Sequence, residues 1–187
     1  MKKALPLKPG KYGVETEDWL FAYYVIARKM ANLERTSILK QVSKNFKTKL
    51  FTRNQTPELS DIQNMGPVDY YNMMPCVFHL SEINLNISLR SIRTGIPLRC
   101  LDIMGAGGFL LSNYQSDFYE HFIPGQDLVL YESVDDLLKK CAYYLRHESE
   151  RKQIAINGYN QVKEYHTYEV RLQQMFDIVF NQGVLQL

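Results

Sequence analysis

The sequence predicts an α/β domain with a Rossmann-like parallel sheet flanked by helices. Short apolar or alternating runs, typical of strands, occupy residues 83–88, 109–112 and 128–131. Segments with helical periodicity lie between and after these runs, and this order is typical of a parallel sheet covered on both faces. The chain has 187 residues, of which 45% are hydrophobic and 22% charged, and this composition indicates one globular domain.

The N-terminal part is predicted to be a lead-in followed by a long helical segment. Residues 1–15 are rich in Lys, Pro and Gly, so the domain itself is expected to span residues 16–187. Thr16 is predicted as an N-cap, and the acidic residues that follow it suit the positive end of a helix dipole. The apolar positions continue through Val42, either as one helix or as two joined near Asn32.

The middle of the chain is predicted to alternate between strands and short helices. The clearest strand covers residues 83–88, where apolar and polar residues alternate strictly. The other predicted elements are a strand at 48–52, a helix at 70–80 that Pro75 could interrupt, a helix at 98–105 ended by Gly107-Gly108, and strands at 109–112 and 128–131.

The C-terminal third is predicted to be helical. Ser133 is expected to cap a helix, with Asp136 completing a capping-box pattern, and the apolar residues up to Leu145 fall on one face. Two further helices are predicted at 149–165 and 167–180.

Several classes of protein are not expected. The longest apolar stretch, Trp19–Ala27, is about half the ~20 residues of a membrane-spanning helix, and no signal peptide is visible. The three cysteines, Cys76, Cys100 and Cys141, have no paired spacing, which predicts reduced thiols in a cytoplasmic protein. The four histidines have no metal-ligand spacing, so no metal site is expected.

Charge is distributed unevenly along the chain. Residues 1–54 carry twelve Lys/Arg and four Asp/Glu, a balance of +8, whereas residues 55–187 carry ten and sixteen, a balance of −6. The basic residues of the first part are spread over a tail and a helix, so they predict a solvated helix face and not a nucleic-acid partner.

Three arginines stand out in the acidic part. Between Gln55 and Leu138 the only basic residues are Arg90, Arg93 and Arg99. Arginine binds phosphate through two parallel hydrogen bonds, so these residues form a candidate anion site. On charge alone the alternative is favoured: the arginines are exposed or pair with Asp102, Asp117 and Glu120.

The position of these arginines favours a nucleotide ligand. Ligands of open α/β sheets bind at the carboxyl ends of strands, and the strand at 83–88 leads directly into the arginines. Asp102 could accept hydrogen bonds from ribose hydroxyls. Gly105, Gly107 and Gly108 could let the backbone approach a ligand closely, although for the glycines alone a helix C-cap followed by a tight turn is the favoured explanation.

Other polar residues leave alternatives open. Asn84, Asn86 and Ser88 share one strand face, which either meets a polar site or caps local backbone. His121 and His166 have no catalytic partner at a recognisable spacing, so both are predicted to be structural, and no catalytic residue is assigned. The paired tyrosines are predicted to be half-buried packing residues; they are Tyr23-Tyr24, Tyr70-Tyr71 and Tyr143-Tyr144.

These residues, in order and spacing, resemble the C-terminal domain of glycosyltransferases with the GT-B fold. The bacterial glycosyl transferase family 1-like proteins, including spore-maturation-type proteins, are the most similar group. The resemblance covers about residues 30–180. The matching segments are 33–39, 83–87, 95–99, 102–111, 143–145, 150–158 and 166–171.

The resemblance implies a domain that binds a nucleotide-diphosphate sugar. GT-B enzymes have two Rossmann-like domains, of which the N-terminal one binds the acceptor and the C-terminal one the donor. Arg90 and Arg99, with Arg93, would hold the donor diphosphate, and no metal or other cofactor is expected. Asp102 falls at the second acid of the family's E-x7-E motif, which contacts the ribose or sugar, whereas Thr94 stands at the first.

One domain is half of a GT-B enzyme. The resemblance therefore implies a fragment of a hexosyl-transferring glycosyltransferase that lacks its N-terminal acceptor domain, with an unknown acceptor and no transfer activity by itself. The alternative is a non-catalytic nucleotide- or protein-binding module that retains the fold.

Overall fold

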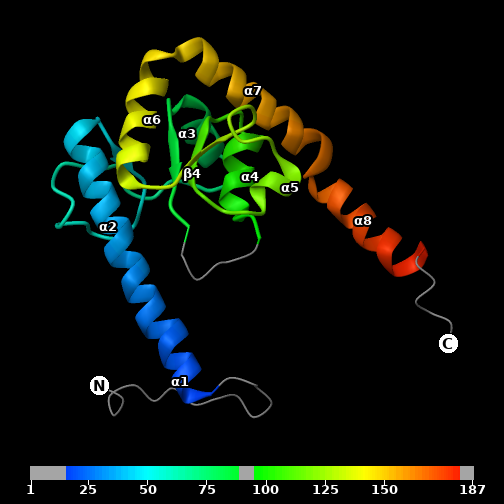
Figure 1. Cartoon of the computed structure of the whole chain (residues 1–187), viewed down its shortest axis with the longest axis horizontal. Helices are drawn as coiled ribbons and strands as arrows, with labels where there is room; N and C mark the ends of the chain where they lie inside the picture. Colours follow the sequence, from blue (N-terminus) through cyan, green and yellow to red (C-terminus); the bar gives the residue numbers. More distant parts are fainter. Residues whose placement is uncertain (1–15, 89–94, 182–187) are drawn as a thin grey trace. The chain divides into compact units, whose positions relative to one another are not determined.

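The computed structural model describes residues 16–88 and 95–181, and these fall into two compact units (Figure 1). The first unit contains residues 16–66, and the second contains residues 67–88 and 95–181. The predicted division of the chain into residues 1–15 and 16–187 stays a prediction.

The first unit begins with one long helical segment. α1 (Glu17–Leu20) continues into the π-helix η2 (Phe21–Ala27) and then into α2 (Arg28–Asn45). Thr16 caps this segment as predicted, because its Oγ1 accepts a hydrogen bond from the Trp19 N–H at 3.2 Å. The helix is therefore continuous, without a joint at Asn32.

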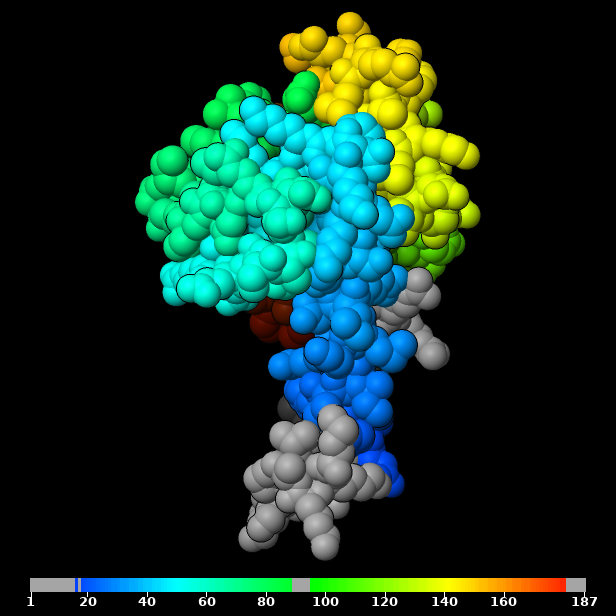
Figure 2. Space-filling model, turned by 90° about the vertical axis from the view of Figure 1, so that its left-hand side faces the viewer, coloured from blue at the N-terminus to red at the C-terminus, as the bar shows by residue number. Residues whose placement is uncertain are grey.

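The buried apolar residues of the first unit come from the C-terminal half of α2 and from residues 46–66. β1 (Lys49–Leu50) pairs in parallel with β2 (Gln63–Asn64). Figure 2 shows residues 46–66, in cyan, against the upper part of this helix, while its beginning, in blue, extends beyond them. The buried residues are Ile38, Val42, Leu59 and Ile62.

The second unit is built on a three-stranded parallel sheet. β3 (Asn84–Asn86), β4 (Leu110–Asn113) and β5 (Val129–Tyr131) are hydrogen-bonded in that order, with Leu85 opposite Leu111 and Ser112 opposite Leu130. Because the strands are parallel, their carboxyl ends meet at one edge of the sheet. The predicted α/β architecture with a parallel sheet is confirmed.

Helices connect and cover these strands. α4 (Leu98–Gly105) lies between β3 and β4 in the chain, and the short α5 (Phe118–His121), which was not predicted, lies between β4 and β5. The remaining helices are α3 (Met74–Leu80), α6 (Val134–Arg146), α7 (Glu148–Tyr165) and α8 (Tyr168–Asn181). No helix in the described part of the chain is long and apolar enough to cross a membrane.

Two local predictions about helix starts can be checked directly. Ser133 Oγ accepts a hydrogen bond from the Asp136 N–H at 3.2 Å, which confirms the predicted cap of α6. Pro75 lies in the first turn of α3 and therefore begins this helix instead of interrupting it.

Alternate residues of β4 supply the two faces of the core. Leu110 belongs to a buried cluster with Cys100, Ile103 and Met104 of α4. Leu111, fully buried, points to the opposite face by strand alternation. On that opposite face the ring of Phe109 packs against the ring of Tyr144 of α6, with ring centroids 4.9 Å apart. Figure 1 shows α4 and α6 on opposite sides of β4, which explains why the strands are apolar on both faces.

Candidate functional site

Buried amide and hydroxyl groups line the carboxyl edge of the three-stranded sheet. Asn86, the last residue of β3, donates through Nδ2 to Ser88 Oγ and to Ser112 Oγ, both at 2.9 Å. Asn113, the last residue of β4, accepts the Ser88 N–H on Oδ1 at 2.7 Å. The ends of β3 and β4 are therefore tied together by side chains.

Asn84 has a different role from Asn86. Its Nδ2 donates to the Phe78 carbonyl at 2.9 Å and to the Phe109 carbonyl at 3.3 Å, so Asn84 caps backbone groups, which is one of the two predicted alternatives. Asn86 and Ser88 instead bond side chain to side chain at the edge where a ligand of an α/β sheet would lie.

Gln115 has a buried oxygen without a partner at this same edge. It follows the end of β4 by two residues and is 7% exposed. Its Oε1 has no hydrogen-bond partner in the structure of the described residues. Buried polar atoms are nearly always paired, so this oxygen needs an explanation.

Asp117 fixes the point at which the chain approaches α4. Its Oδ2 accepts the Gly95 N–H at 2.5 Å, and its Oδ1 accepts a hydrogen bond from the Ser116 hydroxyl at 2.9 Å. The bond from Gly95, followed by that from Ser116, lowers the pKa of the Asp117 carboxyl. Gly95 has a φ of +91°, a conformation that favours glycine.

Of the three predicted arginines, the structure describes Arg99; Arg90 and Arg93 lie outside the described residues. Arg99 is exposed in the first turn of α4 and forms no hydrogen bond or ion pair with another described residue. The start of α4 has no side-chain cap, which leaves its first N–H groups without side-chain acceptors. This end of α4 lies at the carboxyl edge, because α4 follows β3 in the chain.

Asp102 shares the exposed face of α4 with Arg99, one turn further on. Its Oδ2 accepts a hydrogen bond from the Tyr70 hydroxyl at 2.5 Å. The charge of Asp102 raises the pKa of Tyr70, and the charge of Arg99, three positions away on the same helix, lowers it. The structure thus assembles the predicted Arg99 and Asp102 with a residue that the sequence assigned to packing.

The predicted glycines divide into two groups. Gly105 lies on the exposed face of α4 with Asp102. Gly107, with φ of +74°, and Gly108 close the helix: their N–H groups donate to the Met104 and Ile103 carbonyls at 2.8 and 2.9 Å. This is a Schellman C-cap, so the alternative explanation accounts for Gly107 and Gly108 without a ligand.

A family model described as glycosyl transferase-like matches residues 31–177. The chain belongs to the glycosyl transferase-like family. The resemblance to the C-terminal domain of GT-B glycosyltransferases is confirmed, while the spore-maturation-type subgroup stays a prediction. No curated protein matches the sequence at a significant level.

Three solved structures are similar in fold to this glycosyl transferase-like chain. The C-terminal domain of a glycosyl transferase group 1 family protein (LpcC) from Francisella tularensis is 16% identical, with a TM-score of 0.58 over 72% of this chain and 80% of that domain. Anabaena Alr3699/HepE, solved in complex with UDP and glucose, is 10% identical, with a TM-score of 0.59 over 76% of this chain and 44% of its own.

A third similar structure is sucrose-phosphate synthase from Thermosynechococcus elongatus. It is 13% identical, with a TM-score of 0.59 over 84% of this chain and 49% of its own. The glycosyl transferase-like chain therefore spans about half the length of these two larger proteins.

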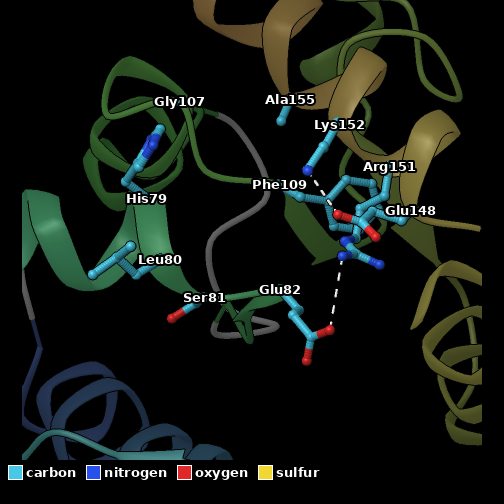
Figure 3. Close-up of a pocket in the computed structure, with 10 residues that line it drawn as sticks. All are labelled: His79, Leu80, Ser81, Glu82, Gly107, Phe109, Glu148, Arg151, Lys152 and Ala155. Carbon is cyan, nitrogen blue, oxygen red and sulfur yellow. Dashed lines mark ion pairs between the residues drawn. The ribbon is translucent and has the colours of Figure 1, made fainter. Parts of the chain in front are cut away.

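A cavity of about 320 Å³ opens at the other edge of the sheet in this glycosyl transferase-like chain (Figure 3). Its two main cations already have partners: Lys152 pairs with Glu148 at 2.6 Å, and Arg151 pairs with Glu82 at 3.8 Å and donates to the Tyr144 carbonyl. We therefore do not place the donor here. The lining residues are His79, Leu80, Ser81, Glu82, Gly107, Phe109, Glu148, Arg151, Lys152 and Ala155.

The two candidate histidines form a structural cluster. His166 stacks on Phe122 with ring centroids 4.8 Å apart and contacts His121 edge-on at 5.3 Å. Burial, followed by the charges of Arg171 and His121, lowers the pKa of His166 to about 4. Its Nδ1 accepts a hydrogen bond from Arg171 at 2.6 Å, so the lone pair that a general base would use is occupied.

Proposed function

We propose that this chain is the donor-binding domain of a glycosyltransferase and binds a nucleotide-diphosphate sugar at the carboxyl edge of its sheet. The observation that carries the proposal is Arg99. This cation is exposed beside the uncapped start of α4, without an ion pair to another described residue, in a chain of the glycosyl transferase-like family. Guanidinium and unpaired helix N–H groups are the groups that bind phosphate.

The other predicted site residues have roles in the same proposal. Arg90 and Arg93 add to the charge around the diphosphate, and Asp102 accepts hydrogen bonds from ribose hydroxyls. Cations and helix N–H groups together can stabilise a leaving diphosphate, so the site needs no metal. The structure of HepE with UDP and glucose supports starting with uridine nucleotides.

Transfer of a hexosyl group would require an acceptor-binding domain. This chain spans about half of HepE and of sucrose-phosphate synthase, and we propose that an N-terminal domain of the same enzyme completes the site. The three free cysteines, two of them buried, support a cytoplasmic location.

Thr94 favours a second candidate function. It stands where the family places the first acid of its E-x7-E motif, so a carboxylate that contacts the donor is missing at this position. The second candidate is a module that retains the fold and binds a nucleotide or a protein without catalysing transfer.

Nucleotide binding tests the proposal. The full chain is titrated with UDP, GDP, dTDP and their glucose derivatives, and binding is followed by ligand-observed NMR. Arg99→Ala should weaken binding by about tenfold to a hundredfold, because a hydrogen bond between charged groups contributes about 1.5–3 kcal/mol. Arg146→Ala is the matched control, since Arg146 is an exposed arginine in the last turn of α6, at the opposite edge.

Two results would contradict the proposal. If none of the six compounds binds at saturating concentration, the donor site is wrong. If Arg99→Ala binds as tightly as the unmodified chain, the diphosphate does not contact the Arg99 side chain, and the observation that carries the proposal is lost.

A further inference from the structure

The side-chain oxygen of Gln115 differs from every other amide at the carboxyl edge. Asn86 uses its Nδ2 for two hydrogen bonds, and Asn113 uses its Oδ1 for one. Gln115 is buried to a similar degree as Asn86, yet its Oε1 has no partner among the described residues. A buried acceptor without a partner loses its hydration and gains nothing in exchange.

The chemistry of this oxygen restricts what can satisfy it. An amide oxygen accepts hydrogen bonds and cannot donate them. A diphosphate is fully deprotonated or nearly so at neutral pH and offers only acceptor oxygens, so it cannot satisfy Gln115 Oε1. The complementary group is a neutral O–H or N–H. In a nucleotide sugar, such groups occur in the hexose, in the ribose and in the base.

The position of Gln115 fits this complement. The residue follows β4, the central strand of the described sheet, and Arg99 starts the helix that precedes β4. One edge of the sheet thus offers two kinds of group: Arg99 for a diphosphate, and the neutral acceptor of Gln115 for another part of the same ligand.

We propose that Gln115 is a specificity-determining residue whose Oε1 accepts a hydrogen bond from a neutral O–H or N–H group of the nucleotide sugar. The proposal rests on the function proposed above. It assigns the uncharged part of the ligand to Gln115, and the diphosphate to other groups. A site that hydrogen-bonds such a group discriminates strongly against ligands that lack it, because its polar atom is then left unpaired.

The proposal has a consequence for stability that does not depend on any ligand. If Oε1 is paired only when the ligand is bound, its unpaired burial lowers the free energy of unfolding of the ligand-free protein. Replacing Gln115 by methionine, which has a similar shape and no strong acceptor, should raise Tm by about 2–4 °C, as expected for a chain of this size. The same substitution should weaken binding of the nucleotide sugar about tenfold.

The experiment compares Gln115→Met with the unmodified chain. Tm is measured without ligand, and Kd is measured by calorimetry for the tightest binder among UDP-glucose, GDP-glucose and dTDP-glucose and for its parent diphosphate. Gln126→Met is the matched control, because Gln126 is exposed in the turn before β5, at the other edge. It should change neither Tm nor Kd.

The two ligands identify the group that Gln115 contacts. Weakened binding of both compounds assigns the contact to the base or ribose, whereas weakened binding of the nucleotide sugar alone assigns it to the hexose. Either result supports the proposal. In the unmodified protein, the side-chain amide signals of Gln115 should also shift when the nucleotide sugar is added.

Three results would overturn it. Binding by Gln115→Met that equals binding by the unmodified chain removes Gln115 from the site and leaves the donor-binding function intact. A lowered Tm for the variant shows that the amide stabilises the fold and is structural. If the unmodified chain binds none of the compounds, both this proposal and the donor-binding function fail.

Discussion

The hydroxyl of Tyr70 donates a hydrogen bond to Asp102 Oδ2 at 2.5 Å, although the two residues are 32 positions apart in the sequence. This bond, followed by burial and the charge of Asp102, raises the pKa of Tyr70 to about 12, against an opposing effect of Arg99. The carboxylate that we propose to bind ribose therefore already has a hydroxyl partner from its own chain.

The first prediction concerns the titration of Tyr70. Because its pKa is raised from 10.0 to about 12 in the folded protein, its contribution to stability is complete below pH 10 and is lost as the pH rises toward 12. Asp102→Asn removes the charged acceptor, so the pKa of Tyr70 should fall toward 10. An ultraviolet titration measures this, with Tyr70→Phe used to subtract the other tyrosines. If the titration midpoint of Tyr70 is unchanged in Asp102→Asn, Asp102 does not raise the pKa of Tyr70.

The second prediction is that Tyr70→Phe binds nucleotides more tightly. A ribose hydroxyl that bonds to Asp102 Oδ2 competes with the Tyr70 hydroxyl for this oxygen. Removing the competitor should lower Kd about threefold, given the net contribution of about 0.5–1.5 kcal/mol for one hydrogen bond. Calorimetry with the parent diphosphate checks this. Tyr71→Phe is the control, since the neighbouring Tyr71 is 84% exposed. Weaker binding by Tyr70→Phe would instead mean that the phenol orients Asp102 for the ligand.

The parts of the fold that follow from the sequence are those with a clear hydrophobic pattern. β3 alternates strictly, and β5 is a short apolar run, so both were predictable. β2 was not, because Gln63 and Asn64 are both polar and exposed and owe their strand geometry to pairing with β1. The four-residue α5 is too short to show a helical period.

The candidate site was predictable only in part, for a similar reason. Arg99 and Asp102 lie three positions apart in one helix, so their shared face follows from spacing. The contact between Tyr70 and Asp102 depends on how the turn before α3 lies against α4, which no local pattern encodes. The unpaired oxygen of Gln115 is a property of its surroundings, and the only signal in the sequence was its place after a buried strand.

The third prediction separates two glycines of the same segment. A Cβ added to Gly108 would lie 2.6 Å from the Phe78 carbonyl oxygen and 2.7 Å from Asn84 Nδ2, and backbone cannot yield to it easily. Gly108→Ala should therefore lower the free energy of unfolding by about 2 kcal/mol or more, in the range of other overpacked sites. Urea unfolding measures this change.

Gly105→Ala is the matched control for Gly108→Ala. Its added Cβ would meet Val162 Cγ1 at 3.4 Å, an ordinary contact, and alanine is favoured over glycine in a helix by roughly 0.5–1 kcal/mol. This variant should be as stable as the unmodified chain or more stable. Equal losses for the two variants would mean that the backbone around Gly108 relaxes freely, contrary to the C-cap described here.

The fourth prediction is a loss of stability in mild acid that depends on His166. Burial, and then the charges of Arg171 and His121, lowers the pKa of His166 from 6.5 to about 4, so the unfolded chain binds a proton that the folded protein excludes. The contribution of His166 to stability is therefore complete above pH 6.5 and is lost as the pH falls from 6.5 toward 4.

The variant His166→Gln tests this prediction. It keeps an acceptor for Arg171 but cannot titrate, so its free energy of unfolding should fall less over this range, as measured by urea unfolding at about pH 7 and about pH 5. The exposed His147 provides the control variant His147→Gln, which is measured at the same two pH values. The same loss in His166→Gln as in the unmodified protein would show that another group binds the proton on unfolding.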